Sequence, residues 1–109
     1  MRIIALSTLK EFWDRYKDSE QGLLSWYAEV RSAEWNNSGD IKAKYRNASI
    51  IGNKRVVFNI CGNKYRLLCA VAYDRKEVFV KFIGTHKQYN AIDAETYDGK
   101  YFTSYKKRK

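Results

Sequence analysis

The spacing of apolar residues changes once along this chain, near residue 47, and that change restricts the fold more than any other feature. Before it, apolar side chains recur at intervals of three and four residues, as on one face of a helix. After it, apolar and polar side chains alternate, as in strands with one buried face. No proline interrupts either part. A chain of 109 residues with one such change has the length of a single domain.

The first part predicts a short strand and a helical hairpin. The apolar run at residues 2–6 favours a strand, and Ser7 is the expected cap of a helix that ends near Tyr16. Asp18, with Gln21 three residues later, predicts the start of a second helix. The expected apolar faces of the two helices are formed by Leu9, Phe12, Trp13 and Tyr16, and by Leu23, Trp26, Tyr27 and Val30. Two successive helices with a short connection pack antiparallel.

The second part predicts a meander of strands. Strands are expected at residues 48–51, 55–60, 64–73 and 77–83, separated by short turns rich in glycine, asparagine and aspartate. Links of this length join antiparallel neighbours. A last short helix is expected from about residue 86 to 93. The predicted class is therefore α+β, with an N-terminal strand and a helical hairpin packed on a twisted antiparallel sheet and a short C-terminal helix.

The end of the chain differs from the rest. Residues 98–109 hold five basic residues and one acidic residue, and they follow the expected domain of residues 1–97. The wider tail, which begins at Tyr97, also contains four aromatic residues. We expect a basic tail outside the core, mobile or ordered by a partner.

Charge is distributed unevenly between the two parts. Residues 1–40 hold five basic and seven acidic residues, a net charge of −2, whereas residues 41–109 hold sixteen and five, a net charge of +11. A surface this basic attracts polyanions, chiefly nucleic acid. No apolar run approaches the ~20 residues that span a bilayer, and no secretory signal is present, so we expect a cytoplasmic protein without membrane contact. Cys61 and Cys69 are expected to be reduced, and we predict neither a metal site nor a cofactor.

Alternation along the predicted strands divides the sheet into two faces. One face is apolar and should pack against the helices; in the last strand the alternation assigns Phe82 to it and Ile83 to the opposite face. That opposite face gathers polar and cationic side chains from three strands: Arg55, Asn59, Lys64, Arg66 and Lys81. His86 and Tyr89 follow directly, so this face is a candidate phosphodiester site.

The same side chains also fit an ordinary solvated sheet. Lysines such as Lys64 and Lys81 often serve only to block edge pairing, and a single histidine is more often a surface residue than a catalyst. Arg66 is the exception, because it is predicted in the middle of the sheet and only five acidic residues follow position 40. A ligand phosphate is a reasonable partner for its guanidinium.

Two motifs carry a resemblance to a known family. NKRVVFNICGNKYRLL at 53–68 and FIGTHKQYN at 82–90 resemble the HigB-type toxins of bacterial toxin–antitoxin systems, within the RelE-like superfamily. The opening residues 1–16 and the WYAEVRSAEW segment fit the same family. The resemblance covers about residues 1–97. It implies a metal-independent endoribonuclease that cuts mRNA on the translating ribosome and is silenced by an antitoxin with a helix-turn-helix domain.

The resemblance also assigns candidate site residues. Arg66, His86 and Tyr89 match the motif positions expected to be catalytic. We expect Arg66 to stabilise the phosphorane, His86 to transfer the proton, and Tyr89 either to donate a proton or to stack on a base. The expected RNA contacts are Arg55, Asn59, Asn63, Lys64 and Lys81. The identity of the general base stays open, because Asn90 stands where the family often has aspartate.

Two other functions fit the same sequence. One is a non-catalytic RNA- or ribosome-binding protein that uses the basic face. The other is a toxin of the same fold that poisons a different target, such as a topoisomerase. The antitoxin could bind the basic face or the helical pair, whose acidic residues include Glu20, Glu29 and Glu34.

Overall fold

The computed structural model describes residues 1–52 and 54–98 and has the predicted α+β class. Its elements are β1 (Arg2–Ile4), α1 (Leu6–Arg15), the 3-10 turn η1 (Lys17–Ser19), α2 (Glu20–Arg31), α3 (Ser38–Lys44), β2 (Ser49–Ile51), β3 (Arg55–Ile60), β4 (Tyr65–Ala72), β5 (Glu77–Thr85) and α4 (His86–Tyr89). No helix in the described part is both long enough and apolar enough to cross a membrane. Apart from Asp98, the predicted tail of residues 98–109 lies outside the described residues.

The five strands form one sheet in the order β1-β5-β4-β3-β2. Strands β2 to β5 are antiparallel neighbours, so the predicted meander is confirmed. Strand β1 instead pairs in parallel with β5, with Arg2 opposite Glu77, which makes the sheet mixed. Parallel neighbours need a long connection, and here the helices and the meander together supply it.

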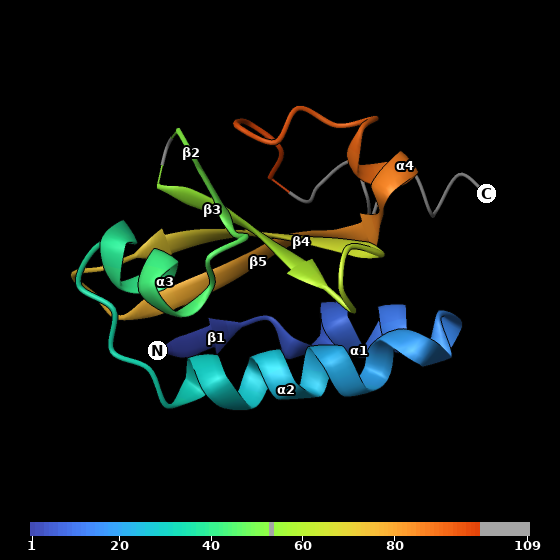
Figure 1. Cartoon of the computed structure of the whole chain (residues 1–109), viewed down its shortest axis with the longest axis horizontal. Coiled ribbons are helices and arrows are strands. Elements are labelled where there is room, and N and C mark those ends of the chain that lie inside the picture. Colours follow the sequence, from blue (N-terminus) through green and yellow to red (C-terminus); the bar gives the residue numbers. More distant parts are fainter. Residues whose placement is uncertain (53, 99–109) are drawn as a thin grey trace.

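Helices α1 and α2 cover one face of this sheet, which we call the helix face (Figure 1). Their predicted apolar stripes are buried or half-buried there. From the sheet, the buried side chains on this face include Val56, Phe58, Ile60, Tyr65, Leu67, Cys69, Val71 and Val78. The ring of Trp26 lies edge-on to the ring of Phe58, with centroids 5.4 Å apart. Most of the apolar surface that folding removes from water is therefore on the helix face.

The predicted helix caps are wrong in both cases. Helix α1 begins after Ala5, and Ser7 lies inside its first turn. Helix α2 begins after Ser19, without a side-chain cap, because the carboxylate of Asp18 is directed toward the β3–β4 turn. The Asp18 carboxylate instead accepts hydrogen bonds from Lys64 and Tyr65, and the bond from the lysine is charge-assisted and therefore strong.

A β-bulge in β5 reverses the side-chain alternation near the end of the strand. Phe82 lies opposite Leu68 of β4, but Val80 lies opposite Cys69, so Lys81 is the extra residue. Because of this one-residue insertion, Ile83 packs on the helix face and Phe82 on the opposite face. The prediction that placed Phe82 against the helices and Ile83 on the open side was therefore wrong for these two residues.

The chain after α4 crosses the second face of the sheet (Figure 1). We call residues 90–97 the strap and the sheet surface beneath it the strap face. A small apolar cluster is buried there, formed by Val57, Leu68, Phe82 and Tyr97. Tyr97 is only 8% exposed, and its ring lies edge-on to the ring of Phe82 at 5.7 Å. The expectation that the aromatic residues from Tyr97 onward lie outside the core is wrong for Tyr97 itself.

Candidate active site

The two motifs that carry the family resemblance meet on the strap face. Arg66 of β4 lies opposite Gly84 of β5, and β5 leads directly into α4, which carries His86 and Tyr89. The Arg66 Nη2 atom contacts His86 Nε2. The guanidinium carbon of Arg66 lies 5.8 Å from the centre of the Tyr89 ring. The three residues predicted to be catalytic therefore form one cluster.

The contact between Arg66 and His86 has a definite hydrogen-bond direction. A guanidinium has donors only, so Nε2 must accept the hydrogen bond from Nη2. His86 is exposed, whereas Arg66 and Tyr89 are half-buried. The cluster thus places the positive charge of Arg66 beside a solvent-exposed imidazole.

The short helix α4 is held in place at its start. Thr85 Oγ1 accepts a hydrogen bond from Gln88 N at 3.2 Å, and Gln88 Oε1 accepts one from Thr85 N at 2.9 Å. These bonds form a capping box, whose Thr-x-x-Gln signature is visible in the sequence but was not used in the prediction. Gln88 also donates to the hydroxyl of Tyr16 at 3.4 Å, which links α4 to the end of α1.

Gly84 makes room for this arrangement. A Cβ atom at residue 84 would lie 2.6 Å from the ring of Phe82 and 2.7 Å from Gln88 Oε1. Both distances are shorter than a carbon atom can approach, so a side chain at residue 84 would displace Phe82 or the capping box. The backbone of Gly84 also pairs with Arg66. The absence of a side chain at residue 84 therefore helps position both motifs.

Arg55 lies apart from the catalytic candidates. Arg55 is only 9% exposed. Its Nη1 atom donates to the carbonyl oxygen of Ala94 at 3.1 Å and to that of Tyr97. The guanidinium therefore fastens the strap to β3. Sequence alternation correctly placed Arg55 on the face opposite the helices, but it could not show that the strap covers this position.

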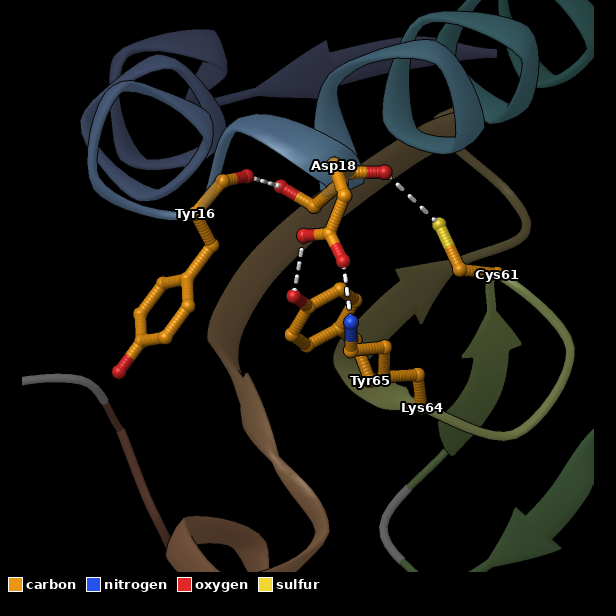
Figure 2. Close-up of polar contacts among 6 residues, drawn as sticks. Tyr16, Asp18, Cys61, Lys64 and Tyr65 are labelled. Atoms are coloured by element: carbon orange, nitrogen blue, oxygen red, sulfur yellow. Dashed lines mark hydrogen bonds and ion pairs between the residues drawn. The ribbon is translucent and has the colours of Figure 1, made fainter.

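Lys64 is also directed away from the catalytic candidates. Its Nζ atom donates to the carboxylate of Asp18, which accepts a second hydrogen bond from the hydroxyl of Tyr65 at 2.5 Å (Figure 2). The hydrogen bond from Lys64, and then that from Tyr65, lower the pKa of Asp18 below its usual value. Cys61 Sγ lies 3.4 Å from the carbonyl oxygen of Asp18 (Figure 2). The cluster joins η1 to the β3–β4 turn. Within it, the charge of Lys64 is paired with the carboxylate of Asp18.

The remaining predicted RNA contacts lie at three different places. Asn59 of β3 is opposite Arg66 in the sheet, and its amide donates to the carbonyl oxygen of Asn47 at 3.2 Å. Asn63 is exposed in the β3–β4 turn. Lys81, in the bulge, places its Nζ atom 5.8 Å from the centre of the Phe79 ring. Of these three residues, Asn59 is the direct neighbour of the catalytic candidates.

The two cysteines are free thiols, as predicted. Cys61 is exposed, and Cys69 is buried on the helix face, where burial raises the pKa of its thiol. Within residues 1–52 and 54–98, no group of three or more histidine, cysteine, aspartate and glutamate side chains could hold a metal ion.

Comparison with known proteins establishes the family. Residues 19–92 match HigB_toxin, described as the RelE-like toxic component of a toxin-antitoxin system. The chain belongs to the HigB toxin family. It is 23% identical over 94 residues to an mRNA interferase HigB of Escherichia coli O6:H1, covering 84% of this chain and 91% of that relative. It is 22% identical over 96 residues to the mRNA interferase toxin HigB of Escherichia coli K12, covering 86% of this chain and 92% of that relative.

The match places the candidate site inside the family region. Residues 19–92 include β3, β4, β5 and α4, and hence all three catalytic candidates. The chain is also 22% identical over 96 residues to an mRNA interferase HigB of Shigella flexneri, covering 86% of this chain and 92% of that relative. Because a HigB toxin is one component of a toxin–antitoxin system, the partner of this chain is an antitoxin. The resemblance predicted from the two motifs is confirmed.

Proposed function

We propose that this HigB toxin is an endoribonuclease that cleaves mRNA at the cluster of Arg66, His86 and Tyr89. The observation that carries the proposal is the contact between Arg66 Nη2 and His86 Nε2 at an exposed position on the strap face. This contact puts a phosphate-binding cation beside a group suited to proton transfer. The names of the relatives, which are mRNA interferases, support the same activity.

The proposed reaction is an internal transfer of the phosphodiester. His86 Nε2 removes the proton of the 2′-hydroxyl, and the 2′-oxygen attacks the adjacent phosphorus. Arg66 binds the non-bridging oxygens, where negative charge increases as the phosphorane forms. The bond to the 5′-oxygen breaks, and that oxygen takes up a proton. The products are a 2′,3′-cyclic phosphate and a 5′-hydroxyl end.

Tyr89 has two candidate roles in this reaction. Its hydroxyl either protonates the departing 5′-oxygen, or its ring stacks on a base of the RNA. Tyr89→Phe separates the two roles, because phenylalanine keeps the ring and removes the proton donor. Slow cleavage with unchanged RNA affinity assigns proton donation, whereas unchanged cleavage assigns stacking.

Substrate binding would itself free the base. In the structure, Arg66 Nη2 lies within hydrogen-bond distance of His86 Nε2, and a guanidinium can only donate, so the lone pair of Nε2 is the acceptor. A phosphate oxygen is a stronger acceptor for a guanidinium than a neutral imidazole, because the bond is then between opposite charges. Arg66 would therefore turn to the phosphate, and Nε2 would become available to the 2′-hydroxyl.

The proposal includes independence from metal ions and dependence on the ribosome. Arg66 supplies the positive charge and His86 the proton transfer that this reaction needs, so the slow cleavage of naked RNA should continue in EDTA. The translating ribosome would hold the mRNA in an extended conformation at the site, and such positioning contributes several kcal/mol to a reaction. Naked RNA should therefore be cut much more slowly than translated mRNA.

The proposed RNA contacts differ from the predicted set in two residues. Asn59, Asn63 and Lys81 stay in it. We leave out Arg55 and Lys64, because their side chains already bind the strap and Asp18. The antitoxin is proposed to carry a helix-turn-helix domain, as the family resemblance implies.

The test is to map RNA 5′ ends by primer extension on a translated reporter. Wild type, Arg66→Ala and His86→Ala would each be expressed with and without a block of translation initiation. We expect new ends only for wild type and only during translation. Arg66→Ala should reduce cleavage on the order of a hundredfold or more, as for loss of a donor that stabilises the transition state.

Two results would contradict the proposal. New ends that persist at the wild-type rate in Arg66→Ala would show that the reaction occurs elsewhere. Growth arrest without new ends would leave a non-catalytic RNA-binding protein or a toxin with a different target.

A further inference from the structure

A basic groove lies beside the candidate active site, at the turn between α3 and β2. Its lining residues are Lys44, Tyr45, Arg46, Asn47, Ala48, Phe58, Asn59 and Gly62. None of these eight residues is acidic. Lys44 and Arg46 are exposed, and neither forms an ion pair with the described residues. The groove therefore presents two positive charges that form no ion pair within the described chain.

The backbone of this turn is held rigidly. Lys42 Nζ donates to the carbonyl oxygens of Arg46, at 2.7 Å, and Ala48, at 2.8 Å. The amide of Asn59 donates to the carbonyl oxygen of Asn47 at 3.2 Å. These bonds use Lys42 of α3 for structure and fix the positions from which Lys44 and Arg46 extend. A preorganised site loses less conformational freedom on binding than a mobile one.

Asn59 connects the groove to the catalytic candidates. It lines the groove and is also the direct cross-strand neighbour of Arg66. Asn59 Oδ1 and Arg66 Nε are both buried and have no hydrogen-bond partner within the described residues. Cross-strand neighbours lie about 5 Å apart at their Cα atoms, so the groove ends next to the cluster of Arg66 and His86.

We propose that this groove binds the ribose-phosphate backbone of the RNA segment that adjoins the scissile phosphate. Lys44 and Arg46 contact phosphates, and the exposed Asn47 contacts ribose or base atoms. This inference rests on the proposed function, since it takes the scissile phosphate to lie at Arg66. Asn59 joins the groove to the catalytic candidates, so one RNA strand can pass from Arg66 to Arg46 along the protein surface. This continuity favours RNA over an acidic protein segment.

The direct test is RNA binding as a function of salt. The probe is a single-stranded RNA of about 12 nucleotides with 2′-O-methyl groups, which lacks the attacking hydroxyl and is not cut. The variant is Lys44→Ala with Arg46→Ala. The matched control is Lys10→Ala with Arg31→Ala, which removes the same charges from exposed positions on α1 and α2. Thermal unfolding of each variant checks that the fold is intact.

The expected result is a smaller salt dependence for the groove variant alone. Each lost phosphate contact reduces the slope of log K against log salt by about 0.7 for a single strand, so two contacts reduce it by about 1.4. Binding at low salt should weaken at least about tenfold relative to the control. A slope equal to that of the control variant would overturn the proposal.

Cleavage of a translated reporter separates this inference from the proposed function. If wild type produces no new RNA ends, the proposed function fails. If wild type cleaves and the groove variant shows the control slope, only the inference about the groove fails. A groove variant that keeps the wild-type RNA slope but loses antitoxin binding would show that the groove holds an acidic protein segment, and this result also overturns the proposal.

Discussion

The two faces of the sheet differ in how they are covered. The helix face lies under α1 and α2 and contributes almost only apolar side chains to a large buried cluster. The strap face buries Val57, Leu68 and Phe82 together with Tyr97 of the strap, and next to them it carries Arg66 and Asn59. Because neighbouring residues of a strand point to opposite faces, the same strands form both surfaces. One face therefore holds most of the core, and the other carries the candidate active site.

The strap face also divides into two zones. Where the strap lies, even the charged Arg55 is buried and bonded to backbone carbonyls. Where the strap has not yet begun, Arg66 and His86 stay accessible. The boundary is α4, since Tyr89 packs against the strap cluster and also lies beside Arg66. The division between core and site on this face is thus made by the path of the chain after β5.

The sharpest test of this comparison uses two adjacent residues of β4. Leu67 is fully buried on the helix face, and Leu67→Ala should lower the free energy of unfolding by about 2–5 kcal/mol. Arg66→Ala should change stability much less while reducing cleavage on the order of a hundredfold or more. Urea unfolding and primer extension measure the two effects. Equal loss of stability in both variants would show that the two faces contribute equally to the stability of the fold.

The second test releases the strap. Arg55→Ala leaves the carbonyl oxygens of Ala94 and Tyr97 without their donor, and we expect a loss of about 1–3 kcal/mol in unfolding free energy. Amide hydrogen exchange should increase in residues 90–97 before it increases in α2. Arg75→Ala, which removes an exposed arginine paired with Glu77, is the control and should cost little. Unchanged exchange in the strap would contradict the role of Arg55.

The third test adds one methyl group beneath α4. Gly84→Ala forces a Cβ atom against Phe82 and Gln88, and overpacking of this kind costs about 1–3 kcal/mol. Cleavage should fall as well, because the capping box that holds His86 is displaced. Gly52→Ala is the control, since its added Cβ would lie 3.4 Å from Glu95 Oε2, an ordinary contact. Wild-type stability and cleavage in Gly84→Ala would show that α4 tolerates the displacement.

The smallest expected effect is the pH dependence of the contact between η1 and the β3–β4 turn. Folding lowers the pKa of Asp18 from its usual value of 3.8, chiefly through the hydrogen bond from Lys64. The stabilisation is therefore present above that usual value and is lost as the pH falls through the lowered value. Urea midpoints of wild type should exceed those of Asp18→Asn at neutral pH and converge with them in strong acid. A constant difference across this range would mean that the carboxylate charge is not involved.

The sequence by itself determined the order of the strands and of the two long helices, the α+β class and the family. Its evidence was local, because helical and strand periodicities and short turns depend on residues that are close along the chain. The limits of β3 and the antiparallel meander followed from this information. The motifs around Arg66 and His86 identified the family and the candidate site, and the structure brought these two residues into contact.

Only the tertiary structure decided which predicted site residues are available. The bulge at Lys81 changed the faces of Phe82 and Ile83, and the strap buried Arg55. Asp18, predicted as a helix cap, instead pairs with Lys64 from a distant turn. The parallel pairing of β1 with β5 likewise joins segments far apart in the chain. Each of these features depends on contacts between residues separated by tens of positions, which a periodic pattern does not encode.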